Sequence, residues 1–133
     1  MSRPKDVLRK WVEAFNTRDA EAAANLYHED AHSVQLAFGT PLVGRRAILE
    51  DLRQFFEHNP DNETHPINLL EDGEWAVVEW KGTATFYASP GSEGKPFKLQ
   101  GCGFFRIVDG KIREQRGYFD KATWFKQVGL PLE

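Results

Sequence analysis

The stretch from Leu99 to Pro131 reads LQGCGFFRIVDGKIREQRGYFDKATWFKQVGLP and carries the strongest fold signal in the chain. Two runs typical of strands, residues 97–108 and 111–119, are joined by Asp109-Gly110. An Asp-Gly pair between two such runs is a strong short-range signal for a β-hairpin, because both residues tolerate positive φ angles. The sequence therefore predicts an antiparallel hairpin near the end of the chain.

The remaining elements follow from the spacing of apolar residues, which is helical in some segments and strand-like in others. The expected helices cover residues 4–16, 20–27, 45–58 and 121–128, and the other expected strands cover residues 31–38, 65–70 and 75–87. Helices come first and an antiparallel meander follows. This order predicts an α+β fold in one domain, residues 1–133, with helices packed on one face of a curved antiparallel sheet. Such a sheet forms a cone whose open end is a natural ligand site.

The composition argues against several classes of partner. The net charge is −3 over 133 residues, and the basic residues are scattered, which is untypical of a nucleic-acid-binding surface. No apolar run approaches the roughly 20 residues that a membrane span needs. Cys102 is the only cysteine, so the chain forms no internal disulfide, which fits a reducing compartment. We therefore expect a cytoplasmic protein with no nucleic-acid or membrane partner.

Three segments together resemble the nuclear-transport-factor-2-like superfamily, in particular its SnoaL-like branch. They are WVEAFNTRDAEAAANLYHEDA (11–31), GRRAILEDLRQFF (44–56) and GCGFFRIVDGKIREQRGYFD (101–120). The superfamily includes polyketide cyclases, ketosteroid isomerases and limonene-epoxide hydrolases. The resemblance implies a cone-shaped sheet wrapped around the N-terminal helices, a homodimer through the sheet, and chemistry without a metal or organic cofactor.

The resemblance also places the catalytic positions of these enzymes on residues of this chain. The oxyanion-hole Tyr and the general-base Asp of ketosteroid isomerases fall at Trp11 and Gln35, and the protonated Asp falls at Gly103. Trp11 can donate a hydrogen bond, but Gln35 cannot act as a base. The His and Asp of the SnoaL-like cyclases fall at Gly103 and Gly117. We therefore expect Trp11 and Gln35 to orient or polarise a carbonyl group rather than to move a proton.

Asp120 is the carboxylate that remains near the expected mouth of the cone. It would act as a general acid or base if the apolar Tyr118, Phe119 and Trp124 raised its pKa toward neutrality. The alternative is that Asp120 caps the helix over residues 121–128, since Asp is a preferred N-cap residue.

Aromatic rings and a few amides make up the expected ligand-binding surface, a combination that suits a flat apolar molecule held by hydrogen bonds. The expected ligand-binding residues are Trp11, Phe15, Phe38, Phe55, Trp80, Gly103, Phe105, Gln115, Gly117 and Phe119. Alternatively, these rings only close the core. Gly101, Gly103 and Gly117 are expected to widen the floor of the cone or to bend the strands, and the two roles are compatible. No metal site is expected, because the helix before His28 and His32 ends too early for a His-x-x-x-His arrangement.

Three functions remain open on this basis. The first is a protein that binds an apolar or polycyclic small molecule in the cone and, if catalytic, is a cofactor-independent isomerase, cyclase or hydratase with Asp120 as its acid or base. The second is a non-catalytic binding protein with the same site. The third is a dimeric interaction module whose site is vestigial.

Overall fold

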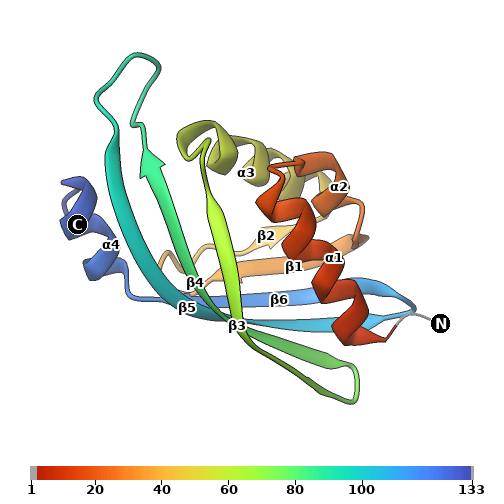
Figure 1. The fold of residues 1–133 in the computed structure, drawn as a ribbon. Helices are drawn as coiled ribbons and strands as arrows, with labels where there is room; N and C mark the ends of the chain where they lie inside the picture. Colours follow the sequence, from red (N-terminus) through yellow and green to blue (C-terminus); the bar gives the residue numbers. More distant parts are fainter. Residues whose placement is uncertain (1–2, 133) are drawn as a thin grey trace.

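The computed structural model describes residues 3–132 and confirms the predicted α+β architecture. Helices α1 to α3 lie together on the concave side of a strongly curved sheet, and α4 lies at the other end beside β5 (Figure 1). The elements are α1 (Pro4–Asn16), α2 (Ala20–Ala24), β1 (Tyr27–Gln35), β2 (Leu42–Val43), α3 (Arg45–His58), β3 (Glu63–Asp72), β4 (Trp75–Phe86), β5 (Lys95–Val108), β6 (Lys111–Phe119) and α4 (Lys121–Val128).

The six strands form one sheet in the order β2-β1-β6-β5-β4-β3. Four of the five neighbouring pairs are antiparallel, as predicted, but β1 runs parallel to β6. The hairpin between β5 and β6 turns at Asp109 and Gly110, which both have positive φ angles of 52° and 78°. The closing hairpin therefore sits in the middle of the sheet, where its inner side faces the helices.

The second helix is shorter than predicted, and the first strand begins earlier. A helix over residues 20–27 was expected, but α2 ends at Ala24 and Asn25 follows as its C-cap. Tyr27 instead starts β1, where it pairs with Ile112, and the Ile112 N–H donates to Leu26 O. Tertiary pairing with β6 therefore overrides the helix preference of the alanine run.

A β-bulge in β6 decides which of its side chains face the helices. The register with β5 shifts between Arg106 and Ile107, so Arg113 and Glu114 together occupy the space of one residue. Without this shift, Ile112 and Gln115 would point to opposite faces of the sheet. Both are buried, at 0% and 6% exposure. The bulge thus lets an apolar side chain and a polar side chain share the concave face.

Two apolar clusters cover the concave face, and Trp80 packs against both. The larger cluster joins α1, α2 and α3 to the sheet around Leu8, Tyr27 and Phe105. The smaller one joins β4 and β5 to α4 around Phe97 and Val128. Together the clusters line the concave face from one end to the other.

Helix α4 is fastened to a part of β5 that β6 does not reach. The pairing of β5 with β6 ends at Gly101 and Phe119. Beyond it, the Gln127 side chain accepts a hydrogen bond from Lys98 N at 2.9 Å and donates one to Lys98 O at 2.8 Å. One amide side chain therefore satisfies both backbone groups of Lys98 as a neighbouring strand would.

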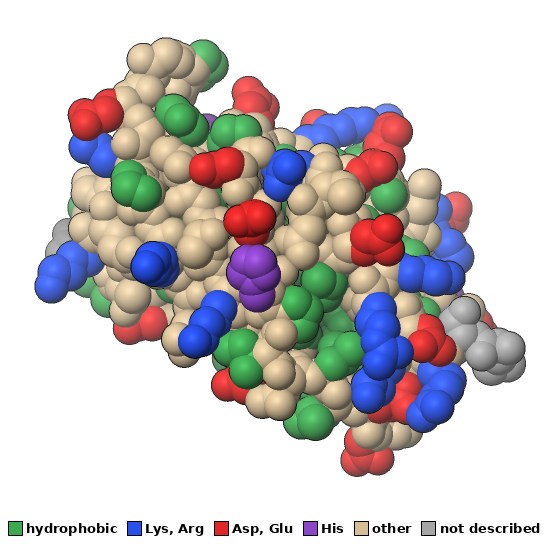
Figure 2. Space-filling view, viewed as in Figure 1, with side chains coloured by type: hydrophobic (Ala, Val, Ile, Leu, Met, Phe, Trp, Pro, Cys, Tyr) green, Lys and Arg blue, Asp and Glu red, His purple; other side chains and the backbone are tan. Residues whose placement is uncertain are grey.

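Charges of both signs are interspersed over the face seen in Figure 2, with no large area of one sign. Within residues 3–132, none of the helices combines the length and apolarity that crossing a membrane requires.

Candidate functional site

A buried cluster of neutral polar groups lies inside the larger apolar cluster. The Trp11 indole N–H of α1 donates to the Tyr27 hydroxyl at 2.9 Å, and that hydroxyl donates to Gln115 Oε1. The Ser33 hydroxyl donates to the same Gln115 oxygen at 3.0 Å. Since its oxygen accepts from two hydroxyls, the amide of Gln115 keeps its NH₂ group for other partners. The four side chains form one polar cluster, with groups from α1, β1 and β6.

Burial keeps this polar cluster uncharged. Tyr27 is 1% exposed, and its burial raises its pKa well above the ordinary tyrosine value; the Trp11 hydrogen bond opposes the shift and the charge of Asp51 adds to it. A hydroxyl, an indole and an amide can hold a carbonyl oxygen or stabilise a developing negative charge, but they do not exchange protons readily near neutral pH.

Sequence reasoning identified Trp11 and Gln115 but missed Tyr27 and Ser33. The helix predicted over residues 20–27 includes Tyr27, whereas the structure places Tyr27 opposite Ile112 on the sheet. Ser33 lies two residues before Gln35 and shares its face of β1, so the alternation of that strand could have indicated it.

The glycines of the concave face are covered by neighbouring side chains. A Cβ atom on Gly117 would overlap the amide of Gln35, and one on Gly101 would lie 2.6 Å from the Trp80 ring. A Cβ on Gly103 would lie 2.9 Å from the ring of Phe105. The expectation that these glycines widen the floor of the cone is therefore wrong, because each gives its space to a larger side chain nearby.

The predicted aromatic residues separate into two groups. In the deep group, Trp11 and Phe15 stack at 4.8 Å between ring centroids, Phe105 lies 5.0 Å from Trp11, and Phe55 lies 5.4 Å from Phe15. In the group beside α4, Phe38 and Phe119 are 5.6 Å apart.

Solvent reaches these two groups unequally. Trp11 and Phe105 are buried in the core, as one alternative had it, whereas Phe38 is 47% exposed. The ring group beside α4 is therefore the accessible end of the aromatic surface.

Two hollows on the described part of the molecule are lined by other residues than these rings. One, of about 700 Å³, is lined by polar residues such as Arg18, Asp61 and Gln127 together with parts of β4 and β5. The other, of about 390 Å³, lies beside His58 and Tyr87. None of the predicted ligand-binding residues lines either hollow. Neither hollow therefore coincides with the predicted aromatic surface.

Asp120 caps α4, and its pKa moves in the direction opposite to the expected one. The carboxylate accepts hydrogen bonds from Ala122 N at 3.0 Å and from the Thr123 hydroxyl at 2.7 Å. These bonds, that of Thr123 foremost, stabilise the charged form and lower the pKa, and the residue is exposed. The expectation that apolar neighbours raise the pKa of Asp120 is therefore wrong. Its role in catalysis remains a prediction.

Among residues 3–132, Asp51 on α3 is the carboxylate whose pKa is raised. The cause is desolvation of a partly enclosed carboxyl group, although the residue as a whole is exposed. Its charge in turn raises the pKa of Tyr27, so the two groups lie within electrostatic range. No sequence motif indicated Asp51.

Comparison with known proteins identifies the family. A family model described as the SnoaL-like domain matches residues 8–115. The chain belongs to the SnoaL-like family. Two curated proteins are similar to this SnoaL-like chain: the aklanonic acid methyl ester cyclases DauD of Streptomyces sp. (strain C5) and DnrD of Streptomyces peucetius. Each is 28% identical over 98% of this chain, which corresponds to 84% of DauD and 94% of DnrD.

Solved structures support the same fold for the SnoaL-like chain. A Catenulispora acidiphila protein with a ketosteroid isomerase-like fold, in complex with trimethylamine, has a TM-score of 0.84 at 18% identity over 98% of this chain and 97% of that one. IdmH of Streptomyces antibioticus, a proposed polyketide cyclase, has a TM-score of 0.79 at 24% identity over 97% of this chain and 100% of that one.

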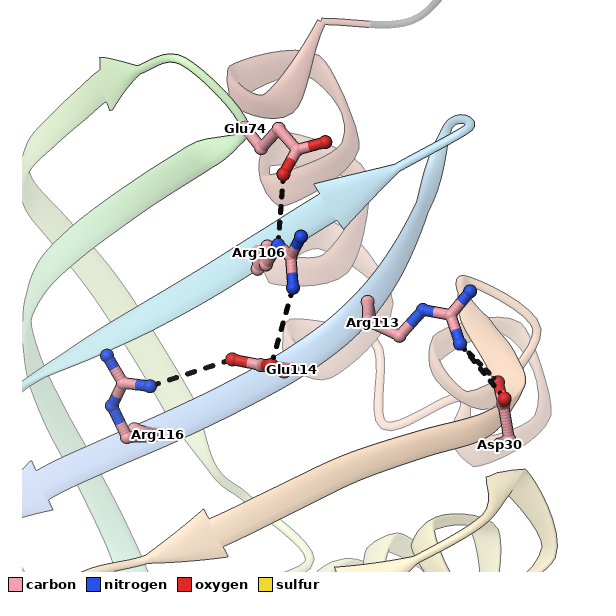
Figure 3. Close-up of polar contacts among 6 residues, drawn as sticks. All are labelled: Asp30, Glu74, Arg106, Arg113, Glu114 and Arg116. Atoms are coloured by element: carbon pink, nitrogen blue, oxygen red, sulfur yellow. Dashed lines mark hydrogen bonds and ion pairs between the residues drawn. The ribbon is translucent and has the colours of Figure 1, made fainter.

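The convex face of the SnoaL-like sheet carries charged side chains. They form the connected series Glu74–Arg106–Glu114–Arg116 and the separate pair Asp30–Arg113 (Figure 3). The N–O distances range from 2.9 to 3.7 Å, and every member is at least 35% exposed. Exposed pairs of this kind contribute little stability individually.

Apolar side chains lie beside these charges. Leu70, Val77 and Phe104 follow one another across three strands, and Phe104 packs edge-on against Tyr118 at 5.8 Å. Leu70 is 61% exposed. A homodimer through this face remains a prediction, and the apolar row is where it would be centred.

Two histidines, His28 and His32, are part of β1. His28 and His32 lie within β1, so the helical spacing needed for a shared metal does not arise. His28 Nε2 lies 2.6 Å from Val108 O. Within the described residues, no group of three or more His, Cys, Asp or Glu side chains is placed to hold a metal ion.

Proposed function

We propose that this SnoaL-like protein binds a flat polycyclic carbonyl compound along the concave face and closes a ring in it without a cofactor. The observation that carries the proposal is the neutral polar cluster of Trp11, Tyr27, Ser33 and Gln115 in surroundings that are otherwise apolar and aromatic. Rings bind the flat faces of such a ligand, and the amide NH₂ groups of Gln35 and Gln115 donate to its oxygens. The names of the two cyclase relatives support the reaction class.

The reaction is an intramolecular aldol closure. A proton leaves a carbon between two carbonyl groups, the resulting enolate carbon forms a bond to the carbon of a third carbonyl group in the same molecule, and the alkoxide formed from that group takes up a proton. The product is an isomer of the substrate, so no oxidant or reductant is consumed. Neutral donors stabilise the enolate oxygen. We assign the proton transfer to Asp51, because its charge acts on Tyr27 of the polar cluster and partial burial raises its pKa, which makes it a better base than an ordinary carboxylate.

Ligand binding is tested by quenching of tryptophan fluorescence with 1,8-dihydroxyanthraquinone, a flat tricyclic carbonyl compound. The native chain should bind this probe, and Gln35→Leu should bind it about tenfold more weakly, since one hydrogen bond is lost. Gln54→Leu on the exposed side of α3 is the matched control and should bind like the native chain. Equal affinity of all three chains would remove Gln35 from the binding surface.

Turnover is tested with aklanonic acid methyl ester, the compound in the names of the two relatives. Chromatography with mass detection should reveal a new species of unchanged mass. Asp51→Asn should abolish it while leaving the affinity for the anthraquinone unchanged. Turnover that survives in Asp51→Asn and disappears in Asp120→Asn would show that Asp120, and not Asp51, transfers the proton.

A non-catalytic binding protein is the second candidate, and one observation favours it. Every member of the buried polar cluster is neutral, and the predicted acid or base Asp120 is an exposed cap. Tight binding of the anthraquinone by the native chain, together with no conversion of the ester at any pH from 5 to 9, would establish this function in place of the cyclase.

A further inference from the structure

The indole N–H of Trp124 is buried without a hydrogen-bond partner among the described residues. This distinguishes it from the indole of Trp11, whose N–H donates to Tyr27. Trp124 lies in the middle of α4, on the side that packs against β4 and β5. A donor that has lost water and gained no acceptor is unusual in a folded protein and calls for an explanation.

Aromatic rings surround Trp124 on several sides. The centroid distances to these rings run from 5.5 to 6.4 Å, and the rings are those of Phe38, Phe86, Phe97, Phe119 and Phe125. Two of them, Phe38 and Phe119, belong to the predicted ligand-binding set. Because Phe38 is 47% exposed, the ring group opens to solvent on that side.

Packing accounts for a large ring at this position but not for its buried N–H. A phenylalanine would supply a ring of similar character and would bury no polar atom. A buried N–H without an acceptor costs folding free energy. The competing explanation is that the N–H points at the face of a neighbouring ring, which is a weak interaction. An acceptor that is present only when a ligand is bound would satisfy the donor fully.

We propose that the Trp124 N–H donates to a carbonyl or quinone oxygen of the bound ligand at the open end of the aromatic surface. This inference rests on the proposed function and sharpens its substrate class. The amides of Gln35 and Gln115 hold oxygens at the inner end, and Trp124 holds one at the outer end. The preferred ligand is therefore a flat polycyclic compound with oxygen acceptors at both ends.

Lys121 adds a positive charge beside the same site. Its Nζ lies 5.7 Å from the ring centroid of Phe38 and 5.3 Å from that of Phe125. At these distances the ammonium group sits over the faces of both rings. An oxygen that carries partial negative charge is favoured next to it.

The test compares the native chain with a chain that carries 3-benzothienylalanine in place of Trp124. That side chain keeps the bicyclic ring and replaces only the N–H with sulfur, so packing is retained. Trp124→Phe is the second variant, and Trp75→Phe on the convex face is its matched control. Affinity for 1,8-dihydroxyanthraquinone is measured by calorimetry, and the indole ¹H–¹⁵N resonance of Trp124 is followed by NMR, assigned by its absence in Trp124→Phe.

We expect the probe to shift the indole proton of Trp124 downfield and to slow its exchange with water. Both Trp124 variants should bind about tenfold more weakly, while Trp75→Phe binds normally. Normal binding by the benzothienylalanine chain would overturn this inference alone, and a weaker Gln35→Leu would then leave the proposed function standing. Failure of the native chain to bind the probe would overturn both.

Discussion

Replacing Tyr27 with phenylalanine tests the buried polar cluster most directly. The hydroxyl donates to Gln115 and accepts from Trp11, so Tyr27→Phe removes two hydrogen bonds. It also leaves the Trp11 N–H buried in the core without an acceptor. Each bond contributes about 1 kcal/mol, and a buried donor without an acceptor costs about 1 kcal/mol or more. The expected loss in the free energy of unfolding is about 3 kcal/mol at pH 7.

Urea unfolding followed by circular dichroism measures this loss. With a slope near 2 kcal/mol per molar urea, the midpoint should fall by about 1.5 M. Tyr118→Phe on the convex face removes a hydroxyl from an exposed ring and should change the free energy of unfolding by less than about 0.5 kcal/mol. A loss in Tyr27→Phe no larger than in this control would refute the assignment of the hydroxyl as the centre of the cluster.

The difference in stability between the native chain and Tyr27→Phe should depend on pH, and the sign of this dependence follows from the raised pKa of Tyr27. Burial raises the pKa of Tyr27 in the folded chain, so the folded state keeps its proton where the unfolded state, with a pKa near 10, loses it. Native stability is therefore unaffected by Tyr27 below pH 10 and falls above it, by about 1.4 kcal/mol per pH unit. Tyr27→Phe lacks this effect, so the difference between the two proteins should narrow between pH 9 and pH 11. A constant difference would mean that the hydroxyl ionises as freely as in the unfolded chain.

Three further predictions concern other parts of the molecule. Gly101→Ala should lower the free energy of unfolding by about 2 kcal/mol, because its Cβ would overlap the backbone oxygen of Tyr118. The Cβ of Gly117→Ala meets only the flexible end of Gln35, so this variant should weaken anthraquinone binding with little change in the thermal midpoint. Asp120→Ala should lower the thermal midpoint more than Asp120→Asn does, because Asn is itself a good N-cap residue. Because the pKa of Asp120 is lowered, the advantage of the native chain over Asp120→Asn should shrink as the pH falls through that pKa; an advantage that persists there would assign the effect to something other than the charged cap. Sedimentation of the native chain should give twice the 15.2 kDa of one copy, and Phe104→Lys on the convex face should give one copy; a native monomer at high concentration would contradict the dimer.

The elements that could be predicted from sequence are those with a strong local signal. Pro4 preorganises the start of α1, the apolar residues of α3 recur at helical spacing, and Asp109-Gly110 turns the hairpin that leads into α4. These signals lie within a few residues of one another, so no knowledge of distant contacts is needed.

The parts that could not be predicted depend on contacts between distant segments. Tyr27 becomes a strand residue because it pairs with Ile112, far along the chain, and the bulge at Arg113 then places Gln115 beside it. The glycine at 117 looked like empty space, yet the side chain of Gln35 occupies it. Sequence patterns indicate which residue types face inward but not which of them share the same volume.

The amide of Gln127 gives α4 a second role at the edge of the sheet. A strand whose backbone groups are unpaired invites another chain to add to it, and such addition leads to aggregation. By bonding both backbone groups of Lys98, Gln127 occupies that edge with a helix, which cannot be extended by a further strand. A movement of α4 away from the rings of Trp124 and Phe38 would therefore also break the two bonds of Gln127 and leave the backbone groups of Lys98 unpaired. An opening of α4 wide enough for the proposed ligand would thus carry the cost of an exposed strand edge, in addition to the cost of separating the rings.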